Sequence, residues 1–473
     1  MSEENTASPQ GLRLKKVEVF GLWGRQDIDL RLNDELSIIF SRNGSGKTTL
    51  LNLIYSVLTA DLEKLFSLPL VHSVRLTFGT PEFGQVKILQ ALFQHHPLDD
   101  ATSKASTSQG EEGGTGPEED NLIYLKLEQH KFSFIRQDAE FRSPAQERRR
   151  TAYLNALKEE LGLDVVKIVT VYRKNRFSFT GPEGYIFSMD REVSAVDERI
   201  KELAGEFRDY NDTLLKQIQQ RWETFRQDVF RALLKAPFAK MAEADKNKDK
   251  YTDDDDITHS LRQFHKAMEA LKLNTENDER LTAKFEGSYE EYMEARKNGA
   301  AGEVPGSAIF ELFGKINALY EAAEQDNFAI LRPAKRFFES LEHFLTREHF
   351  AKTVGLDRGD LKFYCLEKDP SGGMFVSGQA LGFEQLSSGE KQLLIMFLEA
   401  ILRHGSSQIF IIDEPEISLD LEWQHDLIEH IRLLNPNAQL IIATHAPELV
   451  NAHRNKLISL EKSFKDANKH GDN

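Results

Sequence analysis

One short segment limits what this chain can fold into more than any other feature of the sequence. Residues 41–49 read SRNGSGKTT, directly after the apolar run LSIIF at 36–40 and directly before a helical pattern that extends to about Thr59. A short, continuous apolar run suits a strand that is buried on both faces, as in a parallel sheet. A glycine-rich turn that leads from such a strand into a helix predicts an α/β domain, to which other parts of the chain contribute the neighbouring strands.

The residues of this turn are suited to holding phosphate. Glycines let backbone N–H groups face phosphate oxygens, and the start of the helix adds partial positive charge. In the pattern GxxxxGK[ST], the lysine reaches the β- and γ-phosphates and the hydroxyl is a ligand for Mg²⁺. Here the first glycine of the pattern is replaced by Ser41. We therefore predict that ATP is bound by Asn43, Gly44, Ser45, Gly46, Lys47, Thr48 and Thr49, and that Thr48 is also a ligand for Mg²⁺.

A second apolar run, at 409–412, ends in the adjacent acids Asp413 and Glu414. Buried strands rarely end in paired carboxylates unless a cation is near. Asp413 is predicted to hold Mg²⁺ directly or through water, and Glu414 to polarise an attacking water as general base. Taken alone, the same segment is also compatible with an acidic turn that binds nothing.

Three further segments are candidates for the same binding site. LSSGEKQ at 386–392 precedes a helical pattern, so its hydroxyls and N–H groups could bind an anion or simply cap the helix. ISLD at 417–420 follows the paired acids, and THAP at 444–447 follows another apolar run. A lone histidine such as His445 is more often structural than functional, so its position after a buried strand is what makes it a candidate.

The order of these segments resembles that of the ABC superfamily of ATPases. In that family the LSGGQ signature closes over the γ-phosphate bound to the P-loop of the other subunit; this chain has Ser388 and Glu390 where the family has Gly and Gln. The resemblance implies that Ser387, Ser388 and Gly389 act across a dimer. It also implies that Asp420 belongs to the D-loop at the dimer interface and that His445 contacts the γ-phosphate.

The glutamine of the family's Q-loop has several candidates in this sequence. It should follow the first helix, and Gln85, Gln90 and Gln137 all fit.

The branch of the superfamily is indicated by the long interval between Lys47 and Ser387. Transporter subunits have a much shorter segment there, whereas chromosome-maintenance and double-strand-break-repair ATPases have heads split by a helical excursion. The single cysteine, Cys365, excludes the CxxC zinc hook of the break-repair type. The phrases LSSGEKQLLIMFLEAI, FIIDEPEISLDLEWQ and LIIATHAPELV resemble the OLD-like ATPases of bacterial phage-defence operons still more closely.

That resemblance implies a regulatory ATPase. OLD nucleases continue into a metal-dependent nuclease domain, but this sequence ends at Asn473, so we expect no such domain here. The chain is most similar to the PARIS-type ATPase component, which holds a toxic nuclease until an invader protein is sensed. The implied partners are further copies of the chain, forming a homo-oligomer built on ATP-sandwich dimers, and a separately encoded effector protein, a nuclease.

We predict an α/β fold class: an ABC-type P-loop ATPase head, with a mixed sheet and a parallel α/β core, and an inserted helical arm. The N-terminal lobe spans 1–190 and includes a polar, acidic, Gly- and Ser-rich insertion at 95–120 that we expect to be disordered. Apolar residues recur every three or four positions within 191–350, the predicted arm, and Pro333 punctuates its second helix. The alternative is an ordinary helical subdomain; the C-terminal lobe spans 351–473.

The net charge of −16 argues against a protein that coats DNA. Nucleic-acid contact remains possible through local basic runs, which are otherwise solvated faces or internal ion pairs: Arg148, Arg149 and Arg150, and Arg173, Lys174 and Arg176. No apolar run approaches the roughly 20 residues of a membrane helix, and the start MSEENTASPQ does not resemble a secretory signal. We therefore expect a cytoplasmic protein without membrane contact.

Two rival functions remain at this stage. One is a DNA-binding, SMC-like ATPase in DNA repair or processing, which a strong salt-dependent affinity for DNA would favour. The other is a nucleotide-gated scaffold that does not hydrolyse ATP, and the presence of Glu414 disfavours it because a scaffold has no use for a base.

Overall fold

The computed structural model describes residues 12–67, 71–80, 84–94, 122–135, 143–162, 165–170, 195–235, 307–346, 351–368 and 373–466, with short pieces at 266–267, 270, 294–295 and 298–299. Some of the sequence predictions lie outside these residues. They are the insertion at 95–120, Gln137, and the basic run Arg173, Lys174 and Arg176.

The chain divides into two compact units. The first comprises Met1–Ala204, Glu339–Gly355 and Lys362–Asn473, and the second comprises Gly205–Phe338 and Leu356–Leu361. The helices α5 (Ala195–Lys235) and α8 (Ser307–Leu345) each have one end in the first unit and continue into the second.

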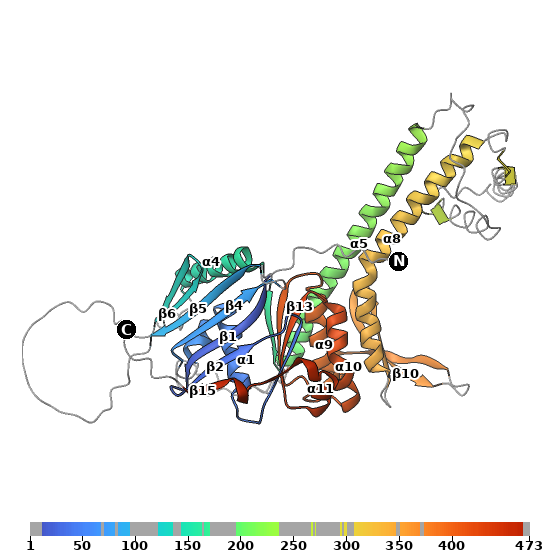
Figure 1. Cartoon of the computed structure of the whole chain (residues 1–473). Helices are drawn as coiled ribbons and strands as arrows, with labels where there is room; N and C mark the ends of the chain where they lie inside the picture. The colour runs from blue at the N-terminus through green and yellow to red at the C-terminus, as the bar shows by residue number, and fades with distance from the viewer. Residues whose placement is uncertain are drawn as a thin grey trace, which may run out of the picture. The chain divides into compact units, whose positions relative to one another are not determined.

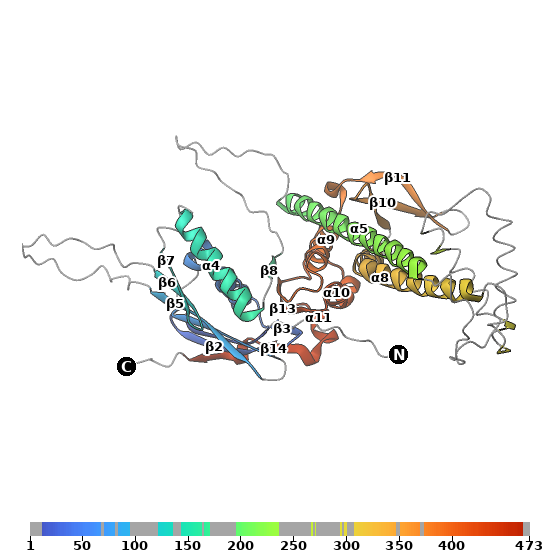
Figure 2. The same ribbon diagram turned by 90° about the horizontal axis from the view of Figure 1, so that it is seen from above.

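The first unit contains a seven-stranded antiparallel sheet with the order β15-β2-β1-β4-β5-β6-β7. Its strands are β1 (Arg13–Leu22), β2 (Gln26–Arg31), β4 (Ser73–Gly79), β5 (Val86–Gln94), β6 (Leu122–Leu127), β7 (His130–Ile135) and β15 (Phe464–Asp466). Alternate residues such as Val74, Leu76 and Phe78 are fully buried, as expected for a sheet with one covered face. Helix α4 (Pro144–Leu161) lies on the concave side of this sheet (Figure 2), and the buried residues of α1 (Lys47–Thr59) share one hydrophobic core with its strands.

A five-stranded sheet supplies the parallel core, with the order β14-β3-β13-β12-β8 and parallel pairing throughout. Its strands are β3 (Leu36–Phe40), β8 (Val165–Thr170), β12 (Gln408–Asp413), β13 (Ala438–Thr444) and β14 (Leu457–Ser459). Helix α1 contacts β8, β12 and β13, so it packs against this sheet as well as against the antiparallel one. Every residue of β12 and β13 is buried, as the continuous apolar runs predict.

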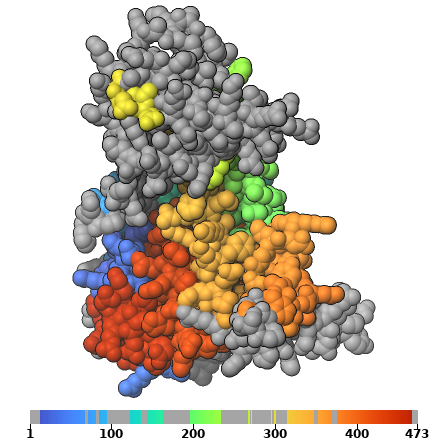
Figure 3. Space-filling model, turned by 90° about the vertical axis from the view of Figure 1, so that its right-hand side faces the viewer, coloured from blue at the N-terminus to red at the C-terminus, as the bar shows by residue number. Residues whose placement is uncertain are grey.

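The C-terminal part of the first unit is helical between its strands. Its helices are α9 (Ser388–Ile401), α10 (Leu421–Leu434) and α11 (Pro447–Ala452), with single turns η2 (Phe383–Gln385), η3 (Arg454–Lys456) and η4 (Glu461–Ser463). They gather beside β13 in Figure 1, and Figure 3 shows N-terminal residues in blue next to C-terminal residues in red on one face. A short helix α2 (Leu62–Ser67) follows α1, and β9 (Lys352–Asp357), β10 (Asp360–Lys368) and β11 (Met374–Leu381) form a separate three-stranded sheet.

Among its described residues, the second unit consists mainly of α5 and α8, which run side by side (Figure 1). Phe207 contacts Phe337 with tilted rings whose centroids are 4.7 Å apart, and Trp222 contacts Tyr320 in the same way at 5.7 Å. Pro333 lies inside α8, which does not end there. Among the described residues no helix is both long and apolar enough to cross a membrane.

The fold class predicted from the sequence is confirmed: the two sheets form a mixed α/β head around α1, and a helical pair is inserted in it. The head is assembled from both ends of the chain. Strand β3 lies between β13 and β14, and β15 pairs with β2.

Candidate nucleotide-binding site

The candidate site begins where three parallel strands end at one edge of the core sheet. Phe40, the last residue of β3, is paired with Thr444 at the end of β13, and Asp413, at the end of β12, is paired with Ala443. The loops that carry the glycine-rich segment, the paired acids and His445 therefore all leave the sheet at the same edge. The carboxyl ends of the strands are where α/β sheets bind ligands.

Both glycines of the glycine-rich loop are required by the backbone conformation. Gly44 and Gly46 have φ of 77° and 92°, a left-handed conformation that is unfavourable for other residues. Ser41, which replaces the first glycine of the pattern, does not have a positive φ. Its hydroxyl instead hydrogen-bonds that of Ser45 across the loop, so the serine links the two sides of the turn.

Lys47 is the first residue of α1 and its side chain is buried in the loop. The Nζ atom donates to the backbone carbonyls of Ser41, at 2.8 Å, and Arg42, at 3.3 Å. The first turn of α1 has no acidic residue, so the positive end of the helix dipole is not neutralised there. A buried ammonium and an uncompensated helix N-terminus together favour an anion in this loop.

Asp413 has the donor chemistry that Mg²⁺ requires. Burial raises the pKa of its carboxyl group, as do the charges of Glu414 and Glu416, while the side chains of Thr48 and Lys47 lower it. One carboxylate oxygen, Oδ1, is buried without a hydrogen-bond partner. A carboxylate and a hydroxyl facing each other, with an oxygen still unsatisfied, fit a hard cation with oxygen ligands.

Glu414 and His445 meet beyond the strand ends. Glu414 has a φ of 52°, and its N–H donates to the carbonyl of Ala443 at 2.8 Å, so the chain turns sharply directly after Asp413. Its Oε1 atom lies 3.9 Å from Nδ1 of His445. The imidazole side chain is 43% exposed, which leaves it accessible to a ligand at the edge of the sheet.

A third acid, Glu416, approaches the histidine more closely and was not among the predicted site residues. Its Oε1 atom accepts the N–H of His445 at 3.0 Å and lies 3.3 Å from Nδ1. The only signal in the sequence is that DEPE contains a second glutamate shortly after the pair of acids.

The signature segment forms the start of α9. Ser387 is the N-cap, its hydroxyl accepts the N–H of Glu390 at 3.2 Å, and the Glu390 carboxylate accepts the N–H of Ser387 at 2.6 Å. The Glu390 carboxylate also forms a buried ion pair with Lys352. The glutamate at the family's Gln position therefore caps the helix and anchors it to β9.

The signature and the D-loop are in direct contact within one chain. A Cβ atom on Gly389 would lie 2.4 Å from the carbonyl oxygen of Ser418, so only glycine fits. Gln392 donates to the carbonyl of Pro415 at 3.1 Å, and Asp420 caps α10 through the N–H of Trp423 at 2.8 Å.

In the part of the chain that the structure describes, no hydrogen bond or ion pair links Ser387, Ser388 or Gly389 to residues 41–49. The structure does not identify the glutamine of the Q-loop. Gln90 lies within β5, paired with Arg75 and Lys126, and Gln85 precedes that strand.

Trp23 is a second residue near the loop that the sequence did not single out. It lies in the turn between β1 and β2, and a Cβ atom on Gly46 would lie 2.5 Å from the edge of its ring. The ring also stacks with Phe464, with centroids 6.4 Å apart. An aromatic ring that is 37% exposed therefore borders the phosphate-binding loop.

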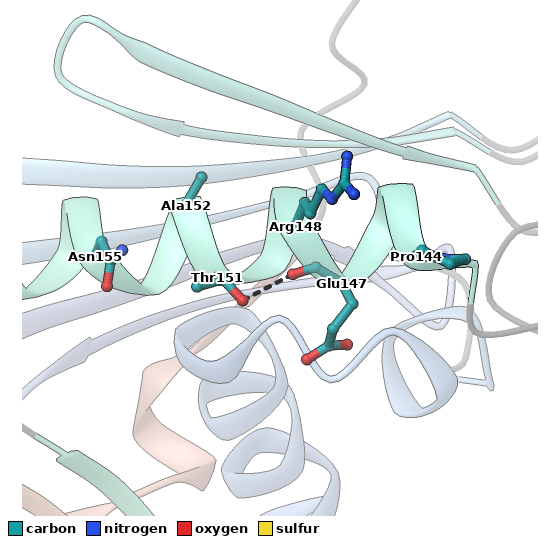
Figure 4. A pocket seen from close by; sticks show the side chains of 6 residues that line it. All are labelled: Pro144, Glu147, Arg148, Thr151, Ala152 and Asn155. Atoms are coloured by element: carbon teal, nitrogen blue, oxygen red, sulfur yellow. Dashed lines mark hydrogen bonds between the residues drawn. The ribbon is translucent and has the colours of Figure 1, made fainter.

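A groove of about 530 Å³ lies elsewhere, along the outer face of α4 (Figure 4). It is lined by Pro144, Glu147, Arg148, Thr151, Ala152 and Asn155. None of these residues belongs to the strand-end loops described above. The neighbouring Arg150 donates to the carbonyl of Thr59 at 3.2 Å, so part of this basic run makes an internal contact.

A family model described as an AAA ATPase domain matches residues 13–450. No curated protein matches the chain.

Among solved structures, the chain is similar to Smc head domains. One from Pyrococcus furiosus, with an extended coiled coil and bound to the C-terminal domain of ScpA, is 13% identical, with 95% of this chain and 97% of that chain covered and a TM-score of 0.39. One from Pyrococcus yayanosii is 15% identical, with 93% of each chain covered and a TM-score of 0.37. The head domain from Thermotoga maritima is 12% identical, with 93% and 92% covered and a TM-score of 0.33.

Proposed function

This chain belongs to the AAA ATPase domain family, and we propose that it binds ATP with Mg²⁺ and hydrolyses it to ADP and phosphate at the strand-end site. The observation that carries the proposal is the meeting of sequence-distant groups at one sheet edge. Lys47 and Thr48 lie on the first helix, and both act on the pKa of the buried Asp413 carboxyl group. Glu414 and His445 follow the two neighbouring strands.

The glycine-rich loop binds the phosphates. Its N–H groups and the Lys47 ammonium face the β- and γ-phosphate oxygens, and the ammonium exchanges the loop carbonyls for phosphate. Thr48 and Asp413 hold the Mg²⁺ ion, which supplies positive charge to the phosphates when it is bound. The Trp23 ring stacks on the nucleobase next to Gly46.

Glu414 is the general base of the reaction. Its carboxylate accepts a proton from water as the water oxygen bonds to the γ-phosphorus, and the bond from that phosphorus to the oxygen bridging it to ADP breaks. The sharp turn at Glu414 directs its side chain differently from that of Asp413, so one carboxylate holds the cation and the other activates water. His445 donates a hydrogen bond to the γ-phosphate oxygens from Nε2.

A second copy of the chain completes the site. Ser387, Ser388 and Gly389 of that copy close over the γ-phosphate, and Asp420 lies at the interface between the copies. Within one chain, Gly389 and Gln392 contact the segment that leads into the D-loop, which supports a site that two subunits share. ATP is then a bridge between subunits, and hydrolysis allows them to separate.

The nucleotide state controls a separate effector protein, which we propose is a nuclease in antiphage defence in the cytoplasm. The resemblance of the 386–401 and 409–423 segments to OLD-like ATPases supports this role. The structure offers a path for such control, because Lys391 and Glu399 of α9 form ion pairs with Asp197 and Arg199 at the start of α5. A movement of the signature helix is thereby transmitted to the helix that leads into the second unit.

Steady-state phosphate release tests the proposed activity. Wild type should hydrolyse ATP, and Glu414→Gln should bind ATP but release phosphate at least about 10²-fold more slowly. Glu422→Gln, a substitution of an exposed carboxylate on α10, is the matched control and should behave as wild type. If wild type and Glu414→Gln release phosphate at equal rates close to zero, the proposed ATPase activity is excluded.

Two further measurements test the assembly and the role. Glu414→Gln should form a larger species with ATP in size-exclusion chromatography with light scattering, and an unchanged mass would exclude the shared site. Wild type should show weak affinity for DNA because of its net charge. Tight, salt-dependent DNA binding would instead favour an SMC-like ATPase that acts on DNA.

A further inference from the structure

Glu416 has an environment that a solvent-exposed acid in a loop would not have. It lies in the segment between β12 and α10, and its side chain is only 7% exposed. One carboxylate oxygen, Oε2, is buried without a hydrogen-bond partner. Burying a carboxylate in this way is unfavourable unless the group makes a specific interaction that the molecule uses.

The interaction is with a single residue, His445, at two atoms. Oε1 of Glu416 accepts the backbone N–H of His445 at 3.0 Å and lies 3.3 Å from its ring atom Nδ1. The backbone contact fixes where the loop leaves β13, and the ring contact fixes the rotation of the imidazole. One carboxylate oxygen therefore sets both the position and the orientation of the ring.

A second carboxylate lies near the same ring atom. Oε1 of Glu414 is 3.9 Å from Nδ1 of His445, farther than Oε1 of Glu416 at 3.3 Å. Each contact of the imidazole with Glu414 would occupy the group proposed to activate water. The closer Glu416 competes for Nδ1 and so separates the tasks of the histidine and of Glu414.

The backbone of Glu416 reaches the D-loop. Its carbonyl accepts the N–H of Leu419 at 3.1 Å, next to Ser418, whose carbonyl packs against Gly389. The side chain of Glu416 thus contacts the histidine loop while its main chain shapes the D-loop. A change in the D-loop can therefore reach the ring of His445 through one residue, Glu416.

We propose that Glu416 is a positioning residue for the hydrolysis reaction: it holds His445 by its N–H and by Nδ1, so that Nε2 faces the γ-phosphate. This inference rests on the proposed function. Hydrogen bonding at one imidazole nitrogen generally decides the role of the other, and removal of such a partner leaves the ring in the wrong tautomer or orientation.

The first experiment compares Glu416→Ala with Glu416→Gln. The glutamine keeps an oxygen that can accept both hydrogens of His445, whereas the alanine removes it. Glu416→Ala should lower kcat by about 10²-fold with a much smaller change in KM for ATP, because the ring is misplaced and the phosphate loop is untouched. Glu416→Gln should restore most of that loss, and Glu422→Ala is the matched control on an exposed glutamate. An unchanged kcat in Glu416→Ala would overturn the proposal.

A double-mutant cycle separates positioning from general structural damage. If Glu416 acts only through the histidine, adding Glu416→Ala to His445→Ala should cause no further loss of kcat. Independent, multiplicative losses would show that Glu416 acts elsewhere and would refute the inference.

A measurement without turnover distinguishes failure of this inference from failure of the proposed function. The ¹⁵N chemical shifts of the His445 ring, assigned by comparison with His445→Ala, report which nitrogen carries hydrogen. With a non-hydrolysable ATP analogue bound, wild type should carry hydrogen on both ring nitrogens, Nδ1 facing Glu416 and Nε2 facing the γ-phosphate. Glu416→Ala should lose the hydrogen on Nδ1, whereas Glu422→Ala should not. If wild type does not hydrolyse ATP but the shift is seen, the proposed enzyme fails and the link between Glu416 and His445 stands. If hydrolysis is normal and no shift is seen, the positioning role fails.

Discussion

Replacement of Gly389 by alanine is the perturbation for which the structure gives the clearest magnitude. The added Cβ atom would lie 2.4 Å from the carbonyl oxygen of Ser418, whereas real Cβ atoms essentially never approach closer than 3.0 Å. The D-loop backbone must therefore move by at least 0.6 Å, the difference between these two distances. A backbone carbonyl cannot rotate away as the end of a flexible side chain can.

The expected cost follows from this displacement. Overpacking a close contact typically costs about 1–3 kcal/mol, and alanine returns at most about 0.5–1 kcal/mol through its better helix propensity. We expect a net loss of up to about 2.5 kcal/mol in the free energy of unfolding. Because a misplacement of about 1 Å can cost about 10²-fold in rate, ATP hydrolysis should fall by up to that factor. ATP affinity should change little, since residues 41–49 are not involved.

The same substitution in an open position is the control. Gly314 lies in α8, and a Cβ atom added there would meet no other atom within 4 Å, so Gly314→Ala should raise the free energy of unfolding by about 0.5–1 kcal/mol. Urea unfolding, phosphate release and binding of a fluorescent ATP analogue would be measured on both variants. If Gly389→Ala stabilises the protein as much as Gly314→Ala and hydrolyses ATP normally, the contact between signature and D-loop is not as the structure has it.

Three other predictions concern different contacts. Trp23→Ala should weaken ATP binding by about tenfold but leave inorganic triphosphate binding unchanged in calorimetry, because only the nucleobase loses its stacking partner. Burial raises the pKa of Asp413, so the carboxyl group binds a proton more tightly in the folded than in the unfolded state, and its ionised form lowers stability. Asp413→Asn should therefore be more stable than wild type at pH 7 in urea unfolding, and this advantage should disappear as the pH falls below about 4. Tyr153→Phe should lower the free energy of unfolding by about 1–2 kcal/mol in the same assay, since the buried hydroxyl donates to the carbonyl of Val57 at 2.5 Å.

Much of the head could be predicted because its central strands carry a strong local signal. β3, β12 and β13 are continuous apolar runs that end in polar or glycine-rich loops, so the sequence defines both the strands and the groups at their ends. Helix α4 was not predicted, although Ser143 and Pro144 mark its start and Gly162 its end. Its apolar residues are sparse, and its three consecutive arginines favour an interpretation as a charged surface over one as a packed helix.

Other features depend on contacts between distant segments and have no local signal. β14 and β15 are three residues long and are strands only because β3 and β2 offer them hydrogen-bonding edges. Glu416 and Trp23 are likewise defined by their neighbours, His445 and Gly46. Pro333, expected to punctuate a helix, lies within α8, where the helix continues on both sides.

The position of β3 between β13 and β14 has a consequence for how the protein is made. A ribosome adds on the order of 5–20 residues per second, so the nascent glycine-rich loop waits on the order of tens of seconds for the strands that flank it. During that time β3, with Leu36, Ile38 and Ile39 all destined for the interior, has neither of its final partners. The candidate nucleotide-binding site, which needs β3, β12 and β13 together, is therefore among the last parts of the head to form.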